Sequence, residues 1–254
     1  MALHNPANPS ALWLVRHGES AGNVARDEAE RLGHALIGIS GRDIDVPLSA
    51  LGERQSRALG RWIGQLQPQA RPSVVLCSPY ARAVNTADLL VQAAGLHRPA
   101  VELIVDERLR EKEFGTLNRL TKHGILQQFP EEAARRGEVG KFYYRPPGGE
   151  SWCDVILRLR SVLDHVRLQY AGERVLVVAH QVIVLCFRYL LEELDESRIL
   201  AIDREQEVAN CSLTSYELGE VGGRAKLLLR HYNFVAPLEA AGAEVTQEPD
   251  VRPA

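Results

Sequence analysis

Short, almost continuous apolar runs recur along the chain and are separated by longer segments with helical periodicity. Four runs rich in valine and leucine lie at 11–17, 73–78, 101–106 and 174–180, and each is bounded by polar or proline-containing residues. Consecutive apolar positions are typical of strands that are buried on both faces of a sheet. We therefore predict four strands inside a largely parallel sheet.

Amphipathic segments lie between these runs and predict helices. One of them begins with Ser78, a candidate N-cap, and with Pro79, which suits a first helical turn, while Gly95 can close it. Because strands and helices alternate, the predicted class is α/β, with a mostly parallel central sheet and helices on both faces. The four helical segments are 49–66, 78–95, about 150–170 and the stretch VIVLCFRYLLEEL at 182–194.

Two parts of the chain depart from this alternation. The runs at 211–218 and 225–232 are joined by GEVGG and predict a hairpin or edge pair. Residues 119–149 predict a helical insertion over one edge of the sheet, the usual place for a lid. Since no repeat or composition break marks a second domain, we expect a single domain over 1–238 and a disordered tail at 239–254.

Composition and charge narrow the function classes. The 254 residues are 45% hydrophobic and 25% charged, which is ordinary for a globular protein with one substantial core. A net charge of −3 argues against a nucleic-acid-binding surface, and no signal peptide or apolar run of membrane-spanning length is found. We expect a cytoplasmic protein without nucleic-acid or membrane partners. Its four cysteines form no CxxC pair and are expected to be reduced thiols.

Cationic and imidazole side chains follow the predicted strands at the positions where ligands collect. Arg16 and His17 end the first run, and His180 ends the fourth. In open α/β sheets, ligands bind beyond the carboxyl ends of the strands. Arg82 lies in the first turn of a predicted helix, and a helix N-terminus attracts anions. Since the planar fork of arginine matches phosphate oxygens, these residues predict a site for a tetrahedral dianion such as phosphate.

Phosphate transfer at such a site also requires a proton donor. A histidine nucleophile cannot expel an alkoxide efficiently unless an acid protonates the leaving oxygen. Glu107, Glu111 and Glu113 all follow the apolar run at 101–106. The residues alone do not distinguish these three carboxyl groups.

Six motifs together resemble the histidine phosphatase superfamily, which has the phosphoglycerate-mutase-like fold. They follow the order of that family and cover nearly everything from residue 11 to about 218. The motifs are LVRHGES..N at 14–23, DVPLSALGERQ at 45–55, CSPYARAVNTA at 77–87, RLREKEFG at 108–115, PGGESWCDVILR at 147–158 and VLVVAHQ at 175–181.

The resemblance implies a role for each of the main candidates. It makes His17 the nucleophile that becomes phosphohistidine, and it makes Arg16, Arg82 and His180 the phosphate clamp. It selects Glu111 as the general acid and base. Phosphoryl transfer requires in-line positioning and charge stabilisation, and three cationic groups can provide both without a metal.

Further residues of the opening motif are expected to bind phosphate. These are Gly18, Ser20 and Asn23, of which Asn23 matches an asparagine of the family near the transferred phosphate. Gly18 lacks a side chain and would let the backbone approach the ligand.

One branch of the superfamily resembles the chain around the insertion. In fructose-2,6-bisphosphatase domains a tyrosine, an arginine and a glutamine hold the sugar phosphate, and Tyr144, Arg145 and Gln181 match them. That branch carries a lysine where this chain has Gly148 and an arginine where it has Leu185, so fructose 2,6-bisphosphate loses support as a substrate. Substitution Arg145→Ala is expected to raise KM more than it lowers kcat.

The function expected from these observations is a metal-independent phosphomonoesterase. It would hydrolyse a small phosphorylated metabolite through a phosphohistidine on His17, with no cofactor and no metal. A phosphotransferase of the phosphoglycerate mutase type is the first alternative, and a non-catalytic phosphate-binding module is the second. The expected partner is a small-molecule phosphate ester, and the sequence does not indicate an oligomeric state.

Overall fold

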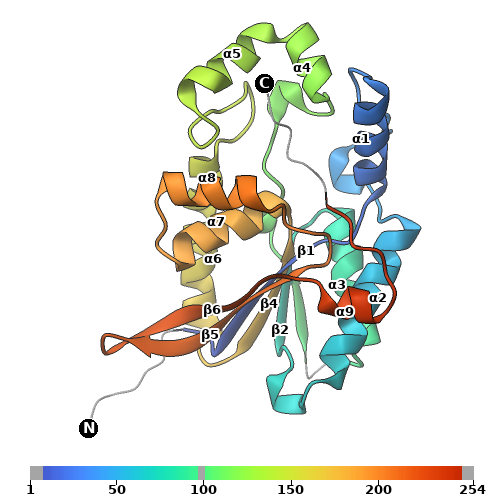
Figure 1. Cartoon of the computed structure of the whole chain (residues 1–254). Coiled ribbons are helices and arrows are strands. Elements are labelled where there is room, and N and C mark those ends of the chain that lie inside the picture. Colours follow the sequence, from blue (N-terminus) through green and yellow to red (C-terminus); the bar gives the residue numbers. More distant parts are fainter. Residues whose placement is uncertain (1–7, 97–100, 248–254) are drawn as a thin grey trace.

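A six-stranded sheet forms the centre of the computed structural model, which describes residues 8–96 and 101–247 (Figure 1). Strands β1, β2, β3 and β4 are parallel, β5 pairs antiparallel with β1, and β6 pairs antiparallel with β5. The order across the sheet is β3-β2-β4-β1-β5-β6. The strands are β1 (Ala11–Arg16), β2 (Val74–Cys77), β3 (Glu102–Val105), β4 (Arg174–Ala179), β5 (Leu213–Val221) and β6 (Arg224–Phe234).

Helices cover both faces of this sheet, which confirms the predicted α/β class. Consecutive residues of β1 contact opposite layers: Leu12 and Leu14 belong to the core beneath α6 and α7, whereas Trp13 and Val15 pack with α2 and α3. Because side chains alternate along a strand, a run that is apolar at every position must be covered on both sides. The covering helices are α2 (Ala50–Gln65), α3 (Ala81–Ala93), α6 (Trp152–Gln169) and α7 (Gln181–Leu191).

The predicted hairpin and the predicted insertion are also confirmed. Strands β5 and β6 form the antiparallel pair at one side of the sheet, and Gly222 and Gly223 make the turn between them, both with positive φ. The insertion contains α4 (Lys122–Gln128) and α5 (Pro130–Val139), which stand beyond the main body of the sheet (Figure 1). It has its own small apolar cluster, formed by Leu117, Leu120, Ile125 and Tyr144.

Among the described residues, three α-helices lie outside the predicted set. They are α1 (Ala21–Leu32), α8 (Glu196–Glu205) and the short α9 (Ala236–Ala240). Only Asn23 and Ala29 of α1 are buried, so this helix lacks the apolar face that would reveal it in the sequence.

The start of α3 differs from the prediction. The helix begins at Ala81 after the N-cap residue Tyr80, which makes no side-chain capping bond, so Ser78 is not the N-cap. The Ser78 hydroxyl instead accepts from the Tyr80 amide and lies 2.7 Å from His180 Nε2. Gly95 does follow the helix end, with a φ of 66°.

The expectation of a disordered tail from residue 239 is wrong for residues 239–247. Helix α9 (Ala236–Ala240) places Leu238 in a small buried cluster with Ala58 and Cys211. Farther along, the Gln55 side chain donates to the carbonyl oxygen of Glu244 at 2.9 Å. This segment therefore packs onto α2, while residues 248–254 lie outside the described part of the chain.

The packing of this C-terminal segment can be tested with Leu238→Ala. Leu238 is fully buried, so its truncation should lower the free energy of unfolding by about 2–5 kcal/mol, measured by urea denaturation. Leu168→Ala is the matched control, because Leu168 is 79% exposed on α6. Equal stability of the two variants would show that the segment does not pack in solution.

Candidate active site

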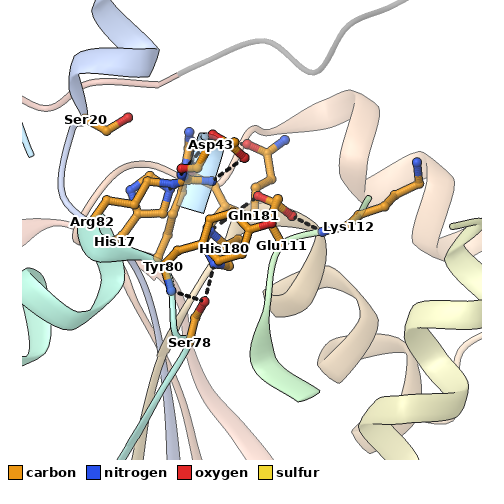
Figure 2. A network of polar contacts seen from close by, with 12 residues as sticks. His17, Ser20, Asp43, Ser78, Tyr80, Arg82, Glu111, Lys112, His180 and Gln181 are labelled. Carbon is orange, nitrogen blue, oxygen red and sulfur yellow. Dashed lines mark hydrogen bonds and ion pairs between the residues drawn. The ribbon is translucent and has the colours of Figure 1, made fainter. Parts of the chain in front are cut away.

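The parallel pairing of β1 with β4 brings two histidines together at the carboxyl ends of these strands. Arg16 pairs with Ala179 in the strand register, and the His17 amide donates to the Ala179 carbonyl oxygen at 2.9 Å. His17 and His180 follow directly, and their ring centroids are 5.1 Å apart (Figure 2). This is the edge of the sheet where the sequence predicted a ligand.

The hydrogen bonds of His17 assign its tautomer. Its Nδ1 lies 2.7 Å from the carbonyl oxygen of Gly18, which can only accept, so Nδ1 carries the proton. Its Nε2 is then the acceptor for Arg82 Nε at 3.3 Å. His17 therefore presents an unprotonated nitrogen beside a guanidinium group, an arrangement suited to nucleophilic attack.

Both histidines are held in the neutral form. Burial lowers the pKa of His17 well below the ordinary value of 6.5, and the charges of Arg82 and Arg16 lower it further. The pKa of His180 is also lowered well below 6.5, by burial first and then by Arg82 and His17. His180 lies between Ser78 Oγ and Glu111, with 3.5 Å from its Nδ1 to Glu111 Oε2.

Two buried arginines flank His17. Arg16 donates to Gln181 Oε1 at 3.1 Å and to the Val208 carbonyl oxygen, while the Arg82 guanidinium lies 4.6 Å from the centre of the Tyr80 ring. Both arginines line a cavity at the carboxyl end of the sheet. Of the eleven predicted site residues, seven line it: Arg16, His17, Ser20, Asn23, Arg82, Glu111 and Gln181.

Ser20 and Asn23 lie at the cavity because they cap α1. The Ser20 amide donates to Asn23 Oδ1 at 2.8 Å, and the Asn23 amide donates to Ser20 Oγ at 3.1 Å. This reciprocal capping box fixes the start of the helix.

Gly18 is required for a reason other than the predicted approach to a ligand. A Cβ at this position would lie 2.5 Å from the Gly52 carbonyl oxygen, and the Gly18 amide donates to Thr86 Oγ1 at 3.0 Å. The glycine therefore allows the turn after β1 to pack against the start of α2.

Among the three candidate acids, only Glu111 lines the cavity. Its Oε1 accepts from the Lys112 amide at 2.8 Å, and burial raises the pKa of its carboxyl group above the ordinary 4.5. Glu113 accepts from the Tyr80 hydroxyl at 3.4 Å, and Glu107 is exposed. Its position at the cavity therefore favours Glu111 among the three carboxyl groups, as the family resemblance does.

A buried ion pair holds the loop that carries Glu111, and the sequence reasoning missed it. Arg158 of α6 donates to the carbonyl oxygens of Arg108 and Glu111, and it also pairs with Glu150 at 2.9 Å. Glu150 in turn accepts from the Glu113 amide at 3.1 Å. Both residues lie in the motif PGGESWCDVILR, where their charges were the available signal.

Asp43 is a second residue that the sequence reasoning missed. It lies in the short helical turn Asp43–Asp45 and forms an ion pair with Arg82. Arg82 Nη1 donates to Asp43 Oδ1 at 3.1 Å and to the Asp43 carbonyl oxygen at 3.0 Å, and Nη2 donates to Oδ2 at 3.4 Å (Figure 2). A carboxylate in a polar loop has no sequence signal that distinguishes it from a solvated one.

The two predicted substrate residues of the insertion do not reach this cavity. Tyr144 donates its hydroxyl to Glu132 at 2.7 Å and lines a neighbouring cavity instead. Arg145 is 61% exposed, forms an ion pair with Asp154, and lines neither cavity. Truncation of Arg145 is therefore no longer expected to raise KM.

Within residues 8–96 and 101–247, no group of three or more His, Cys, Asp and Glu side chains could hold a metal ion. None of the helices described there is long and apolar enough to cross a bilayer. The cysteines are free thiols, as expected, and burial raises the pKa of Cys77 and of Cys211 to about 12.

Comparison with known proteins identifies the family. Residues 12–230 match the model of the histidine phosphatase superfamily (branch 1), and the chain belongs to this family. It is 31% identical over 228 residues to the 2,3-bisphosphoglycerate-dependent phosphoglycerate mutase 2 of Gloeobacter violaceus, covering 89% of this chain and 94% of that protein. It is 32% identical over 179 residues to 6-phosphofructo-2-kinase/fructose-2,6-bisphosphatase of Caenorhabditis elegans, covering 70% of this chain and 33% of that longer protein.

Solved structures of phosphatases share the fold. A mycobacterial glucosyl-3-phosphoglycerate phosphatase in complex with VO3 superposes with a TM-score of 0.68 at 26% identity. The match covers 89% of this chain and 99% of that one. Relatives of the chain thus include both mutases and phosphatases.

The neutral state of the two histidines can be measured by NMR. In phosphate-free buffer the ring signals of His17 and His180 should titrate with midpoints well below 6.5, because burial and the nearby arginines disfavour imidazolium. Spectra of His17→Gln and His180→Gln assign the two signals. A midpoint at or above 6.5 for either ring would contradict the described environment.

Proposed function

We propose that the protein is a metal-independent phosphomonoesterase that hydrolyses a small phosphorylated metabolite through a phosphohistidine on His17. The observation that carries the proposal is the buried His17, whose unprotonated Nε2 accepts from Arg82 Nε and which lines one cavity together with Arg16 and Arg82. Family membership and the phosphatase structures support it.

The first half-reaction transfers the phosphoryl group to the enzyme. His17 Nε2 forms a bond to phosphorus while the bond from phosphorus to the ester oxygen breaks. Glu111, whose raised pKa favours the protonated form, gives its proton to that oxygen, and the alcohol leaves. Arg16 and Arg82 stabilise the charge on the equatorial oxygens. The Gly18 carbonyl oxygen accepts from Nδ1 and so stabilises the positive ring that forms.

The second half-reaction releases the phosphate. The Glu111 carboxylate takes a proton from a water molecule as its oxygen attacks phosphorus, and the bond from phosphorus to Nε2 breaks. Inorganic phosphate leaves, His17 returns to its neutral form, and Glu111 is protonated again. No metal or further reactant is needed to balance the two steps.

The partner that we propose is a small phosphate ester in the cytoplasm. The net charge of −3 supports a small anion over nucleic acid, because phosphate-backbone binding requires an extended basic surface. The cationic cavity supplies positive charge locally instead.

The nucleophile and the acid can be tested with phosphate-release assays in chelator. We expect His17→Ala to lower kcat on p-nitrophenyl phosphate by about a thousandfold or more. Glu111→Gln should reduce kcat on glycerol 3-phosphate far more than on p-nitrophenyl phosphate, because an alkoxide needs protonation more than a nitrophenolate does. Glu113→Gln, a nearby carboxylate outside the cavity, is the control.

Three outcomes would contradict the proposal. Activity that survives in His17→Ala excludes this nucleophile. Transfer between phosphoglycerates without phosphate release would favour the mutase type of the Gloeobacter relative. Phosphate binding without any turnover would favour a non-catalytic binding module.

We also expect Asp43 to compete with the ligand for Arg82. Asp43→Asn should tighten the binding of inorganic phosphate roughly threefold to tenfold in calorimetry, since a negative group that engages the guanidinium is removed. Asp45→Asn is the control, because Asp45 pairs with Arg42 at the exposed side of the same turn. Weaker phosphate binding in Asp43→Asn would mean that Asp43 mainly orients Arg82.

A further inference from the structure

The turn that carries His17 has a hydrogen-bond partner for every backbone N–H and C=O group at residues 17–19. The partners are the Ala179 carbonyl oxygen, the Asn210 side chain, the Cys211 amide, the Thr86 hydroxyl, the His17 ring, the Gln55 side chain and the Ser49 amide. These groups come from segments that are far apart in the sequence. The position of the turn is therefore set by tertiary contacts and not by its local sequence.

One peptide unit of this turn connects the His17 ring to a buried glutamine. The carbonyl oxygen of Gly18 accepts from His17 Nδ1 at 2.7 Å. The N–H of the same peptide unit belongs to Glu19, and it donates to Gln55 Oε1 at 2.9 Å. Because a peptide unit is planar, a bond that holds its N–H also holds the direction of its C=O. Gln55 therefore acts on the group that accepts the ring proton of His17.

The Gln55 side chain is itself fixed by the C-terminal segment. Gln55 is fully buried on α2, and its Nε2 donates to the Glu244 carbonyl oxygen at 2.9 Å and to Thr246 Oγ1 at 3.0 Å. A carbonyl oxygen can only accept, so the amide nitrogen must face Glu244. The oxygen Oε1 is then the atom that meets the Glu19 amide.

Asn210 supports the neighbouring peptide unit in the same way. Its Nδ2 donates to the His17 carbonyl oxygen at 3.0 Å, and its Oδ1 accepts from Thr246 Oγ1 at 3.1 Å. The Asn210 amide also donates to the Thr246 carbonyl oxygen at 2.9 Å. One hydroxyl thus accepts from Gln55 and donates to Asn210, which joins the two side-chain amides behind the turn.

These side chains act on the backbone and not on a ligand. Gln55, Asn210 and Thr246 all lie in the described part of the chain, and none of them lines the cavity that contains His17. The C-terminal segment therefore does not cover the cavity through these contacts. It supports the turn from the side of α2 and of the segment before β5.

We propose that Gln55 is a positioning residue for the nucleophile. By holding the Glu19 amide it directs the Gly18 carbonyl oxygen at His17 Nδ1, which keeps the proton on Nδ1 and leaves Nε2 unprotonated. Asn210 and Thr246 complete this support. The effect on turnover rests on the proposed function, whereas the tautomer of His17 is a property of the resting protein.

Substitution Gln55→Met tests the inference, since methionine has a similar length but cannot accept from the Glu19 amide. Nitrogen-15 NMR at neutral pH should show His17 as a single Nδ1-protonated tautomer in the wild-type protein and as a mixture of both tautomers in the variant. Spectra of His17→Gln assign the ring signals. We expect kcat on p-nitrophenyl phosphate to fall about tenfold and KM to change by less than about twofold, because the arginines that bind phosphate are untouched.

Two control variants separate positioning from a loss of stability. Gln65→Met is the same substitution at an exposed position of α2, and Ile63→Ala removes a fully buried side chain farther along that helix. Both should keep the single tautomer and the wild-type kcat. A mixture of tautomers in Ile63→Ala as large as in Gln55→Met would assign the effect to general destabilisation and would overturn the proposal.

A pair of variants at Thr246 tests the support of Gln55 with less disturbance of the core. Thr246→Val keeps the shape of the side chain and removes the hydroxyl that joins Gln55 and Asn210. It should shift the tautomer in the same direction and lower kcat about threefold, and Thr246→Ser, which keeps the hydroxyl, should restore both. This pair decides the question if Gln55→Met does not fold.

Failure of this inference is distinguishable from failure of the proposed function. An unchanged single tautomer in both Gln55→Met and Thr246→Val overturns the inference, whatever the activity of the wild-type protein. In an active wild-type protein, an unchanged kcat in both variants also overturns it. A tautomer mixture in the variants supports it even if wild-type protein releases no phosphate, a result that would count against the proposed function alone.

Discussion

The in-register parallel pairing of β1 with β4 is the constraint on which the site depends. It sets the His17 amide on the Ala179 carbonyl oxygen and places the two rings at a centroid separation of 5.1 Å. Parallel neighbours such as β1 and β4 are joined by a crossover connection that covers the sheet. Both strands are buried along nearly their whole length, so helices that pack on both faces of the sheet stabilise this pairing. The positions of His17 and His180 at the end of the sheet therefore depend on the packing of the core around β1 and β4.

Burial shifts the pKa values of the titratable groups at this edge of the sheet. Arg16 and Arg82 lie with two histidines in a region of low solvent access, so imidazolium is disfavoured by desolvation and by repulsion from the guanidinium groups. The same burial favours the protonated form of Glu111. One environment therefore lowers the pKa of the histidines and raises the pKa of a carboxyl group that lines the same cavity as His17. Both shifts suit the two proposed half-reactions.

The insertion is packed separately from the part of the sheet that carries the two histidines. Its helices pack on their own small cluster and not on the main core, so changes in them can alter the neighbouring cavity that Tyr144 lines with little effect on the histidines. The loop that carries Glu111 is hydrogen-bonded to Arg158 of α6, which also pairs with Glu150.

The sequence by itself determined the α/β class, the family and most of the residues around His17. Continuous apolar runs correctly predicted burial on both faces for β1, β2 and β4, whereas β3 is a partly exposed edge strand. Side chains that follow neighbouring parallel strands lie close to one another at the same edge of the sheet. The tertiary structure decided what depends on contacts between distant segments. It decided that Glu111 and not Glu113 lines the cavity, that Asp43 engages Arg82, and that Arg145 turns to Asp154. A local sequence pattern cannot show which charged side chain lines a cavity, because the residues that contact it come from distant segments of the chain.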